Sequence, residues 1–337
     1  SVFKKLLDDV KFLNLPYTKG FRERLRSILQ GSEQIELIER ELTLLHAKAI
    51  DCLLTKTGQK FSDVDLIGFH GHTVVHDPDQ FKTHQIGDGA FLAEKTGIDV
   101  VSDLRSNDVA HGGQGAPLVP LYHLALANRL MMPLAILNIG GVSNVTYING
   151  DESSLIAFDA GPGGALLDDW IFQKMGKAFD DSGRVASSGS VSETILNGLL
   201  SSPYFNKPPP KSLDRDHFDI TPIRHLSTRD GAATLTAFTC SAVIRALDHL
   251  PAPPKTLLVA GGGRKNTFLM QKISEGLKVP VRPVEVMGWD GDALEAQAFS
   301  YLAVRSLKQL PITLPGTTGV KEPMSGGVFH PKPSSFN

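Results

Sequence analysis

The chain has 337 residues, a length that favours two domains over one. Hydrophobic residues make up 41% and charged residues 21%, as in ordinary globular proteins, which excludes wholesale disorder or a collagen-like fibre. With 34 Lys plus Arg against 36 Asp plus Glu, a formal net charge of -2 and no basic cluster, the sequence predicts small-molecule chemistry and no nucleic-acid partner.

Neither a membrane span nor a disulfide framework is predicted. No uninterrupted apolar run approaches the ~20 residues of a membrane-spanning helix, and the N-terminal residues mix acids and lysines in a way unlike a secretory signal. The two cysteines, Cys52 and Cys240, form no CxxC motif and fit a reducing compartment. We therefore expect a soluble, cytoplasmic protein.

The first part of the chain predicts helices. Between residues 21 and 58 apolar side chains recur at spacings of three and four, the pattern of amphipathic helices, here two of them broken near Gly31 and Ser32. Further along, residues 201–222 contain five prolines and predict an ordered loop or linker.

Short runs rich in Val, Ile and Leu, each ending in Gly, His, Asp or Asn, alternate with helical patterns in the rest of the chain. Such runs are typical of buried strands whose C-terminal ends carry ligand-binding loops, so an α/β protein is predicted. The runs lie at residues 64–71, 97–104, 133–141, 143–150, 154–163, 255–263 and 279–287.

Two glycine-rich strand ends are candidates for phosphate or nucleotide binding. LNIGGVSN, residues 137–144, predicts a hairpin whose turn presents backbone N–H groups, although a purely structural turn is the alternative interpretation. LLVAGGGRKN, residues 257–266, predicts a buried strand, three glycines that allow close approach of a ligand, and Asn266 as a helix cap. Neither stretch is a Walker A or a GxGxxG motif, which disfavours a P-loop enzyme and a Rossmann dehydrogenase.

A third glycine-rich end, FDAGPGG, places Asp159 directly after a strand and before a predicted helix. A carboxylate beside a helix N-terminus suits a general base working next to a phosphate group. The alternative is that Asp159 caps the turn through its own backbone.

Polar side chains also gather at residues 70–78 and 102–120. Three histidines in the first segment give no tetrahedral ligand set, so no metal site is predicted there. A hydroxylated, anionic small molecule suits these strand ends better, with Arg105 as the partner of a carboxylate. The candidates are His70, His72, His76, Asp103, Arg105, Asp108, His111 and Gln114.

These motifs together resemble the anhydro-N-acetylmuramic acid kinase family of the actin-like ATPase and sugar kinase superfamily. The matching stretches follow the family order from about residue 66 to residue 305. They are GFHGHTVVH, HQIGDGAFLAEKTGIDVVSDLRSNDVAHGGQGAPLVPLYH, LNIGGVSNVTYI, FDAGPGGALLDDW, PYFNKPPPKS, LLVAGGGRKNTFLM and GDALEAQAFSYLA.

The resemblance implies a two-lobed actin-like ATPase (ribonuclease H-like) fold with mixed sheets flanked by helices. It implies ATP and Mg²⁺ as cosubstrate and cofactor, and an amino sugar as the small-molecule partner, with a homodimer also considered. The implied reaction opens the 1,6-anhydro bond of the sugar and phosphorylates O6, giving N-acetylmuramic acid 6-phosphate.

Site residues follow from the same resemblance. Asp159 would be the general base, and His70, Asp103, Arg105 and Glu295 would line the sugar side. The residues expected to bind the nucleotide are Asn138, Gly140, Gly141, Asn144, Gly161, Gly163, Gly261, Gly262, Gly263 and Asn266.

Lobe one is expected to span residues 1–130, completed by a C-terminal helix at 292–310, and lobe two residues 131–337. The family's first phosphate loop, on an N-terminal hairpin, is missing from the sequence, so the sheet of lobe one is expected to have an unpaired edge.

Two alternatives stay open. The missing loop, together with His72, Ser106–Asn107 and Gly164 where the family usually has Gln, two Arg and Asn, would suit an inactive member that binds sugar or nucleotide as a sensor or scaffold. An acyl-phosphate kinase of the same superfamily is the weaker alternative.

Overall fold

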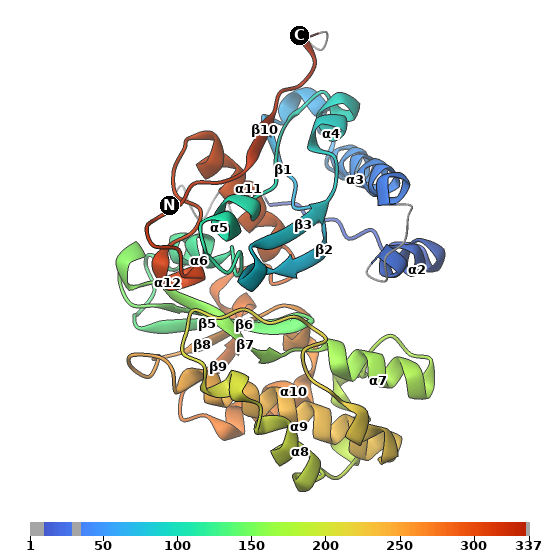
Figure 1. The fold of residues 1–337 in the computed structure, drawn as a ribbon, viewed down its shortest axis with the longest axis vertical. Coiled ribbons are helices and arrows are strands. Elements are labelled where there is room, and N and C mark those ends of the chain that lie inside the picture. The colour runs from blue at the N-terminus through green and yellow to red at the C-terminus, as the bar shows by residue number, and fades with distance from the viewer. Residues whose placement is uncertain (1–9, 29–34, 335–337) are drawn as a thin grey trace. The chain divides into compact units, whose positions relative to one another are not determined.

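The computed structural model describes residues 10–28 and 35–334, and the predicted helix break at Gly31 and Ser32 lies outside them. The chain forms two compact units (Figure 1). Unit 1 comprises the described residues up to Val119, Glu295–Pro315 and those from Val320 onward, and unit 2 comprises Pro120–Leu294 and Gly316–Gly319.

Unit 1 contains a three-stranded sheet in the order β1-β4-β10 and a separate antiparallel hairpin, β2-β3. The strands are β1 (Leu66–Gly68), β2 (His72–Asp77), β3 (Lys82–Ile86), β4 (Asp99–Ser102) and β10 (Val328–His330). The helices are α2 (Lys19–Ile28), α3 (Ile35–Thr57), α4 (Gly89–Thr96), α5 (Ser106–Ala110) and α11 (Leu294–Leu307), the last counted from Glu295.

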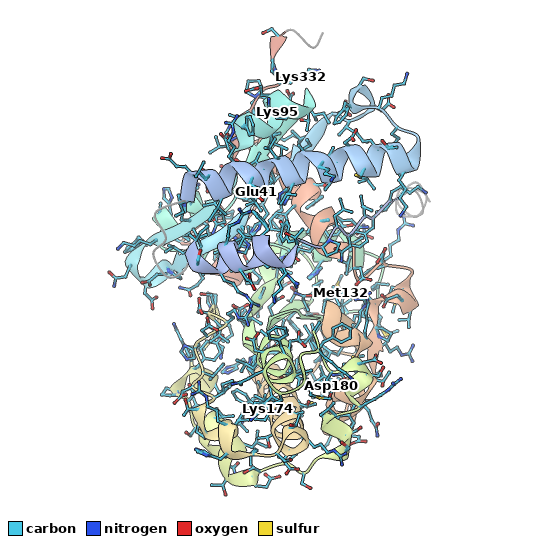
Figure 2. The ribbon with its side chains drawn as sticks, turned by 90° about the vertical axis from the view of Figure 1, so that its right-hand side faces the viewer. Glu41, Lys95, Met132, Lys174, Asp180 and Lys332 are labelled. Atoms are coloured by element: carbon cyan, nitrogen blue, oxygen red, sulfur yellow. The ribbon has the colours of Figure 1, made fainter. Side chains whose placement is uncertain are left out.

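The two predicted N-terminal helices are confirmed as α2 and α3. Phe21 and Leu25 of α2 pack against Leu42 of α3 in one buried cluster that also includes residues of the β2-β3 hairpin. An ion pair of 2.5 Å between Arg24 and Glu41 joins the exposed side of the same two helices, and Figure 2 shows Glu41 on the long helix α3. Burial of one apolar face therefore holds this helical layer in place.

β1 and β10 are the two outer strands of this sheet, and among the described residues β1 pairs with β4 alone, in parallel. The gap expected where an N-terminal hairpin belongs stays a prediction. A cavity of about 370 Å³ runs along β1, between the Leu53–Leu54 turn of α3 and Phe299 of α11. The walls of this cavity are mainly apolar.

The C-terminal segment corrects one expected boundary. Residues up to 337 are expected in lobe two, but β10 pairs antiparallel with β4 and so adds a strand to the sheet of unit 1. The first break between the units lies between Val119 and Pro120 rather than near residue 130. Backbone pairing, and not the Pro/Gly/Ser-rich composition of the tail, decides where this segment belongs.

Unit 2 is built on a five-stranded mixed sheet in the order β7-β6-β5-β8-β9. β5, β6 and β7 form an antiparallel meander, whereas β8 and β9 run parallel to β5, so the predicted α/β fold with mixed sheets is confirmed. The strands are β5 (Leu134–Ile139), β6 (Val142–Ile148), β7 (Ile156–Pro162), β8 (Leu257–Ala260) and β9 (Val281–Pro283). The helices are α6 (Pro120–Ala127), α7 (Ala165–Met175), α8 (Glu193–Leu200), α9 (Thr228–Leu247), α10 (Thr267–Gly276) and α12 (Pro315–Thr318).

One face of this sheet packs on α9 and α10. Leu137 of β5, Val145 of β6 and Phe158 of β7 meet Val243 of α9 and Ile273 of α10 in a single buried cluster. Alternate residues of the same strands point to the other face. That alternation places Asn138, Asn144 and Asp159 on the face of the sheet opposite to α9 and α10.

The proline-rich residues 201–222 form irregular backbone with a short 3₁₀ turn at Pro203–Asn206, and a second turn, Thr221–His225, begins at their end; this agrees with the predicted ordered loop. None of the helices in the described ranges combines the length and apolar character that crossing a membrane requires.

Candidate functional site

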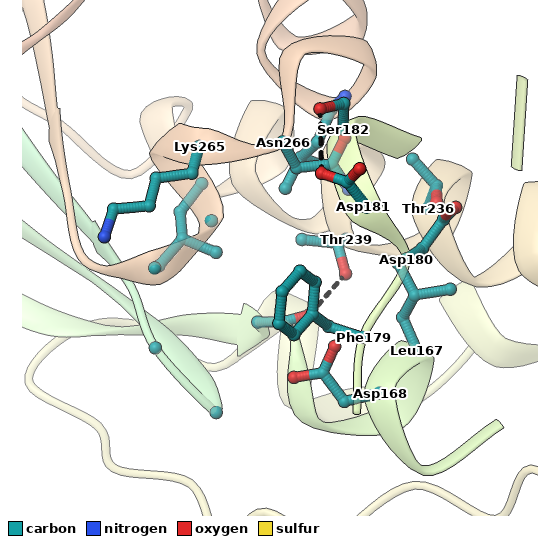
Figure 3. A pocket seen from close by; sticks show the side chains of 18 residues that line it. Leu167, Asp168, Phe179, Asp180, Asp181, Ser182, Thr236, Thr239, Lys265 and Asn266 are labelled. Atoms are coloured by element: carbon teal, nitrogen blue, oxygen red, sulfur yellow. Dashed lines mark hydrogen bonds between the residues drawn. The ribbon is translucent and has the colours of Figure 1, made fainter. Parts of the chain in front are cut away.

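Unit 2 contains a cavity of about 480 Å³, which we call the glycine cavity because Gly140, Gly141, Gly163, Gly164, Gly262 and Gly263 lie in its wall. These glycines belong to turns at the ends of β5, β7 and β8, which meet at one edge of the sheet. Figure 3 shows Leu167 and Asp168 of α7 on one side of the cavity and Lys265 on another. A volume of this size is typical of a small-molecule site.

Hydrogen bonds join the first two glycine turns. The N–H of Gly164 donates to the carbonyl oxygen of Gly140 at 2.7 Å, and the N–H groups of Gly163 and Ala165 donate to that of Gly141 at 3.0 and 3.2 Å. A Cβ atom on Gly163 would lie 2.3 Å from the oxygen of Gly140, so only glycine fits there. The start of α7 therefore uses these three N–H groups to fix the wall of the cavity.

The three glycines after β8 have different surroundings. A Cβ on Gly261 would lie 2.5 Å from Asn138 Oδ1, and one on Gly263 would lie 2.3 Å from Ile139 Cγ2. In the part of the chain that the structure describes, a Cβ on Gly262 would meet nothing within 4 Å apart from its chain neighbours, and Gly262 lines the cavity. Gly261 and Gly263 thus allow close packing on β5, while Gly262 leaves space for a ligand.

Asp159 lies in a polar row that crosses the sheet. The strand register pairs Asn138 with Asn144 and Asn144 with Asp159, and directly paired residues project from the same face. Asp159 is only 6% exposed, and its Oδ2 accepts a hydrogen bond from the N–H of Leu213 at 2.8 Å. The Oδ1 atom of Asn144 is buried and has no hydrogen-bond partner within residues 10–28 and 35–334. The row places two amides and one carboxylate side by side on one face of the sheet.

The ten residues expected to bind the nucleotide fall into two groups. Six line the glycine cavity: Gly140, Gly141, Gly163, Gly262, Gly263 and Asn266. The other four do not: Asn138 and Asn144 belong to the polar row, Gly161 packs against Ala242 of α9, and Gly261 forms the turn before Gly262. Asn266 also caps α10, as predicted, by accepting the N–H of Leu269 at 3.0 Å.

Several cavity residues were missed by the sequence analysis. Asp168 comes from α7, Phe179 from the segment after it, and Thr236 and Thr239 from α9. The Thr239 hydroxyl donates to the carbonyl oxygen of Gly163 at 2.9 Å and so ties α9 to the glycine turn (Figure 3). The available signal was the spacing of Thr236 and Thr239, three residues apart, which puts both on one face of a helix.

Asp168 is the acidic side chain with the most perturbed titration in this cavity. Burial, followed by repulsion from Asp169 and Asp180, raises the pKa of Asp168 to about 6, although the nearby Arg215 opposes the shift. The two oxygens of Asp180 accept N–H groups of Val185 and Ala186, each at 2.9 Å. Negative charge at Asp168 is therefore disfavoured unless a cation approaches it.

This shift predicts a pH-dependent gain of stability in Asp168→Asn. A carboxyl whose pKa is higher in the folded than in the unfolded state destabilises the fold progressively from about pH 4 to about pH 6, and fully above that range. The neutral variant should melt at least about 2 °C higher than wild type at pH 8 and show no gain at pH 4. Thermal unfolding at both pH values checks this, with the exposed Asp248→Asn as control. An equal gain at both pH values would contradict it.

In unit 1 the structure brings two of the four expected sugar residues together. The Nε of Arg105 donates to Nε2 of His70 at 3.0 Å, and Nη1 of Arg105 donates to the carbonyl oxygen of Gly115 at 2.6 Å. Burial, reinforced by the charge of Arg105, lowers the pKa of His70 to about 3, so its ring is neutral and accepts this bond. His70 thus fixes the guanidinium group of Arg105.

The other two expected sugar residues lie after β4 and at the start of α11. Asp103 follows β4 with a φ of 49°, a left-handed conformation that is rare for a non-glycine residue and is often found at functional sites. Its Oδ1 accepts the N–H of Ser106 at 3.3 Å. Glu295 is exposed in the first turn of α11. The roles of all four residues stay predictions.

Comparison with known proteins gives the family. The family model for anhydro-N-acetylmuramic acid kinase matches residues 4–332. A relative of that name from Rhizorhabdus wittichii is 50% identical over 330 residues, which cover 95% of this chain and 90% of the relative. Another from Methylobacterium nodulans is 53% identical over 324 residues, covering 93% of this chain and 86% of the relative.

Solved structures are similar only at a distance. A ligand-bound xylulose kinase from Lactobacillus acidophilus is 16% identical with a TM-score of 0.36, covering 65% of this chain and 46% of that chain. A component of the (R)-2-hydroxyglutaryl-CoA dehydratase from Acidaminococcus fermentans is 16% identical with a TM-score of 0.40, covering 75% and 84%. The nearly full-length matches to the family model and to relatives about half identical in sequence decide the assignment: the chain belongs to the anhydro-N-acetylmuramic acid kinase family.

Proposed function

We propose that unit 2 binds ATP in the glycine cavity and that Asp159 is the general base of the family's reaction. Membership of the family gives the chain anhydro-N-acetylmuramic acid kinase activity. In that reaction water adds to C1 of the sugar, the bond from C1 to O6 breaks, and O6 takes the γ-phosphoryl group of ATP. The products are N-acetylmuramic acid 6-phosphate and ADP.

Asp159 supports this role by its surroundings. A general base must lie within hydrogen-bond reach of the water that it deprotonates, in a fixed orientation. Asp159 stands in the polar row, with one carboxylate oxygen held by the N–H of Leu213. The buried Oδ1 of Asn144, next to it in the row, is an acceptor suited to a hydroxyl group or a water molecule.

The glycine cavity supports the nucleotide assignment. Gly140, Gly141 and Gly262 leave its wall without side chains, so a flat or anionic ligand can approach the backbone. Lys265 lies in the wall and pairs with Asp292 at 2.7 Å, so its charge is partly balanced. This combination of open glycine turns in one cavity is the observation that carries the proposal.

The activity is tested by incubating the chain with 1,6-anhydro-N-acetylmuramic acid and ATP. We expect N-acetylmuramic acid 6-phosphate and ADP to appear in a 1:1 ratio, measured by mass spectrometry and a coupled ADP assay. Neither product should form when the sugar or ATP is left out. Binding of both ligands without any turnover would contradict the proposal and favour the inactive sensor or scaffold.

Magnesium fits the cavity through Asp168. Mg²⁺ prefers oxygen ligands and usually combines one or two carboxylates with phosphate oxygens and water. Among residues 10–28 and 35–334 no group of three or more His, Cys, Asp or Glu could hold a metal ion, so Asp168 would hold the ion together with the phosphates. When bound, the ion would neutralise phosphate charge, and the carboxylate of Asp168 would orient the nucleotide toward the glycine turns.

This assignment predicts how Asp168→Asn changes nucleotide binding. Wild type should bind ATP at least about 10-fold more tightly with MgCl₂ than with EDTA, because the carboxylate repels free phosphate and attracts the ion. In Asp168→Asn the ratio of the two ATP affinities should fall below about 3-fold. In EDTA the variant should bind ATP more tightly than wild type does. Calorimetric titration measures both affinities, and Asp248→Asn should keep the wild-type ratio. An unchanged ratio in Asp168→Asn would remove this carboxylate from the magnesium site.

The two-lobe division and the homodimer remain proposals that rest on the family resemblance, and the cytoplasmic location remains a proposal that rests on the cysteine content of the sequence. Sedimentation equilibrium on the purified chain tests the homodimer, and fractionation of the source cells tests the location.

A further inference from the structure

Residues 203–213, which we call the clamp segment, hold Asp159 from several directions. The backbone N–H of Asp159 donates to the carbonyl oxygen of Lys211 at 2.9 Å, and its Oδ2 accepts the N–H of Leu213 at 2.8 Å. The hydroxyl of Tyr204 donates to the backbone carbonyl oxygen of Asp159 at 2.6 Å. The clamp segment therefore forms hydrogen bonds with the backbone N–H, the backbone carbonyl oxygen and the carboxylate of Asp159.

Tyr204 is a fixed donor in this arrangement. It is 7% exposed, and its ring packs edge-on against Phe205 and Phe218, with centroids 5.8 and 6.2 Å away. Burial, with the charge of Asp159 adding to it, raises the pKa of the Tyr204 hydroxyl, which therefore keeps its proton. Its hydrogen bond to Asp159 persists across the pH range in which enzymes work.

Lys211 ties the two ends of the clamp segment together. Its side chain is 1% exposed, and Nζ donates to the carbonyl oxygen of Tyr204 at 3.1 Å. Nζ also lies 4.7 Å from the ring centroid of Tyr204 and 5.7 Å from that of Phe158, the residue before Asp159. The ammonium group is thus held by a carbonyl oxygen and two aromatic faces.

Burying an ammonium group costs desolvation energy that an apolar side chain in the same place would not cost, so packing alone does not explain Lys211. Burial, with a smaller effect from the charge of Lys207, lowers the pKa of Lys211 to about 8, so the group still carries charge at pH 7. A methionine would fill similar space without charge. His249, which follows α9, adds a support, because its Nε2 bonds to the carbonyl oxygen of Phe205 at 2.8 Å and lies 3.5 Å from Lys211 Nζ.

We propose that Lys211 and Tyr204 are positioning residues for Asp159. The buried ammonium fixes the clamp segment, and the hydrogen bonds of that segment hold the carboxylate in one orientation for proton abstraction. The inference rests on the proposed role of Asp159 as general base. A misplacement of about 1 Å in a reacting group can lower a rate ~10²-fold, so loss of the clamp should act on turnover rather than on binding.

The test compares Lys211→Met, Tyr204→Phe and Asp159→Asn, with the exposed Lys207→Met as a matched control. We expect kcat to fall at least about 10-fold in Lys211→Met and about 3-fold in Tyr204→Phe. The KM for the sugar and the calorimetric Kd for ATP should stay within about 2-fold of wild type in both. Lys207→Met, which changes the same charge on the same segment, should behave as wild type.

The outcomes separate this inference from the proposed function. If Asp159→Asn is inactive while both clamp variants keep wild-type kcat, the clamp is overturned and the general base stands. Parallel loss of kcat, ATP affinity and melting temperature would also overturn it, because Lys211 would then be structural only. Wild-type turnover in Asp159→Asn would refute the proposed function itself. If Lys211→Met fails to fold, Tyr204→Phe decides, since it removes only one hydroxyl oxygen.

Discussion

Replacement of Asp159 by asparagine should lower kcat by at least about 10²-fold, because the side chain keeps its shape but can no longer accept the proton of the attacking water. The N–H of Leu213 can still bond to the amide oxygen of the asparagine, so the local backbone arrangement should survive. The Kd for ATP should change by less than about 2-fold, since Asp159 does not line the glycine cavity. Steady-state kinetics and calorimetric titration measure the two quantities.

Asp248→Asn is the matched control for this prediction. It removes the same charge from the same unit at an exposed position just after α9. The control should keep the wild-type kcat. Turnover of Asp159→Asn near the wild-type value would remove this carboxylate from the mechanism. A fall in ATP affinity as large as the fall in kcat would show that the substitution disturbs the unit rather than the chemistry.

Local sequence signals predicted much of the sheet in unit 2. The run at residues 133–141 forms β5, and the Gly140–Gly141 turn forms the hairpin to β6, because a continuous apolar run and a two-residue glycine turn are properties of the segment itself. β10 gave no such signal, since it has three residues, and its pairing with β4 joins segments more than 200 residues apart. The β2-β3 hairpin was also missed, because polar side chains interrupt its apolar alternation.

In the glycine cavity, too, some residues could be predicted from the local sequence, and others are brought there only by the tertiary structure. Its glycine turns could be predicted because such turns are visible in the sequence itself. Asp168 and Thr239 could not, since a helix pattern identifies a buried face but does not say which turn of the helix meets a cavity. In the sequence, Lys211 is only one residue of a motif that matches the family. Its burial depends on how a proline-rich segment without helical or strand periodicity folds. Only the tertiary contacts show that Asp168 and Thr239 line the cavity and that Lys211 is buried.

Valine at Gly262 should weaken ATP binding at least about 10-fold, or ~1.4 kcal/mol, while leaving the fold intact. Within the described residues a Cβ at this position meets no atom within 4 Å apart from its chain neighbours, and Gly262 lines the glycine cavity, so the added side chain would occupy the space in which we propose that the nucleotide binds. The KM for the sugar should stay within about 2-fold of wild type, since its expected contacts lie in unit 1. Gly262→Ala should show a smaller effect in the same direction.

Gly263→Val is the informative comparison for this prediction. The two glycines are adjacent, but a Cβ on Gly263 would lie 2.3 Å from Ile139 Cγ2 and 2.6 Å from Ile139 Cβ, in the packing between this loop and β5. Overpacking of that kind costs typically ~1 to 3 kcal/mol, so Gly263→Val should lower the melting temperature by several degrees, whereas Gly262→Val should not. Thermal unfolding beside calorimetric ATP titration separates the two effects. If the melting temperature of Gly262→Val is as low as that of Gly263→Val, or if Gly262→Val binds ATP as tightly as wild type, then Gly262 does not face the nucleotide.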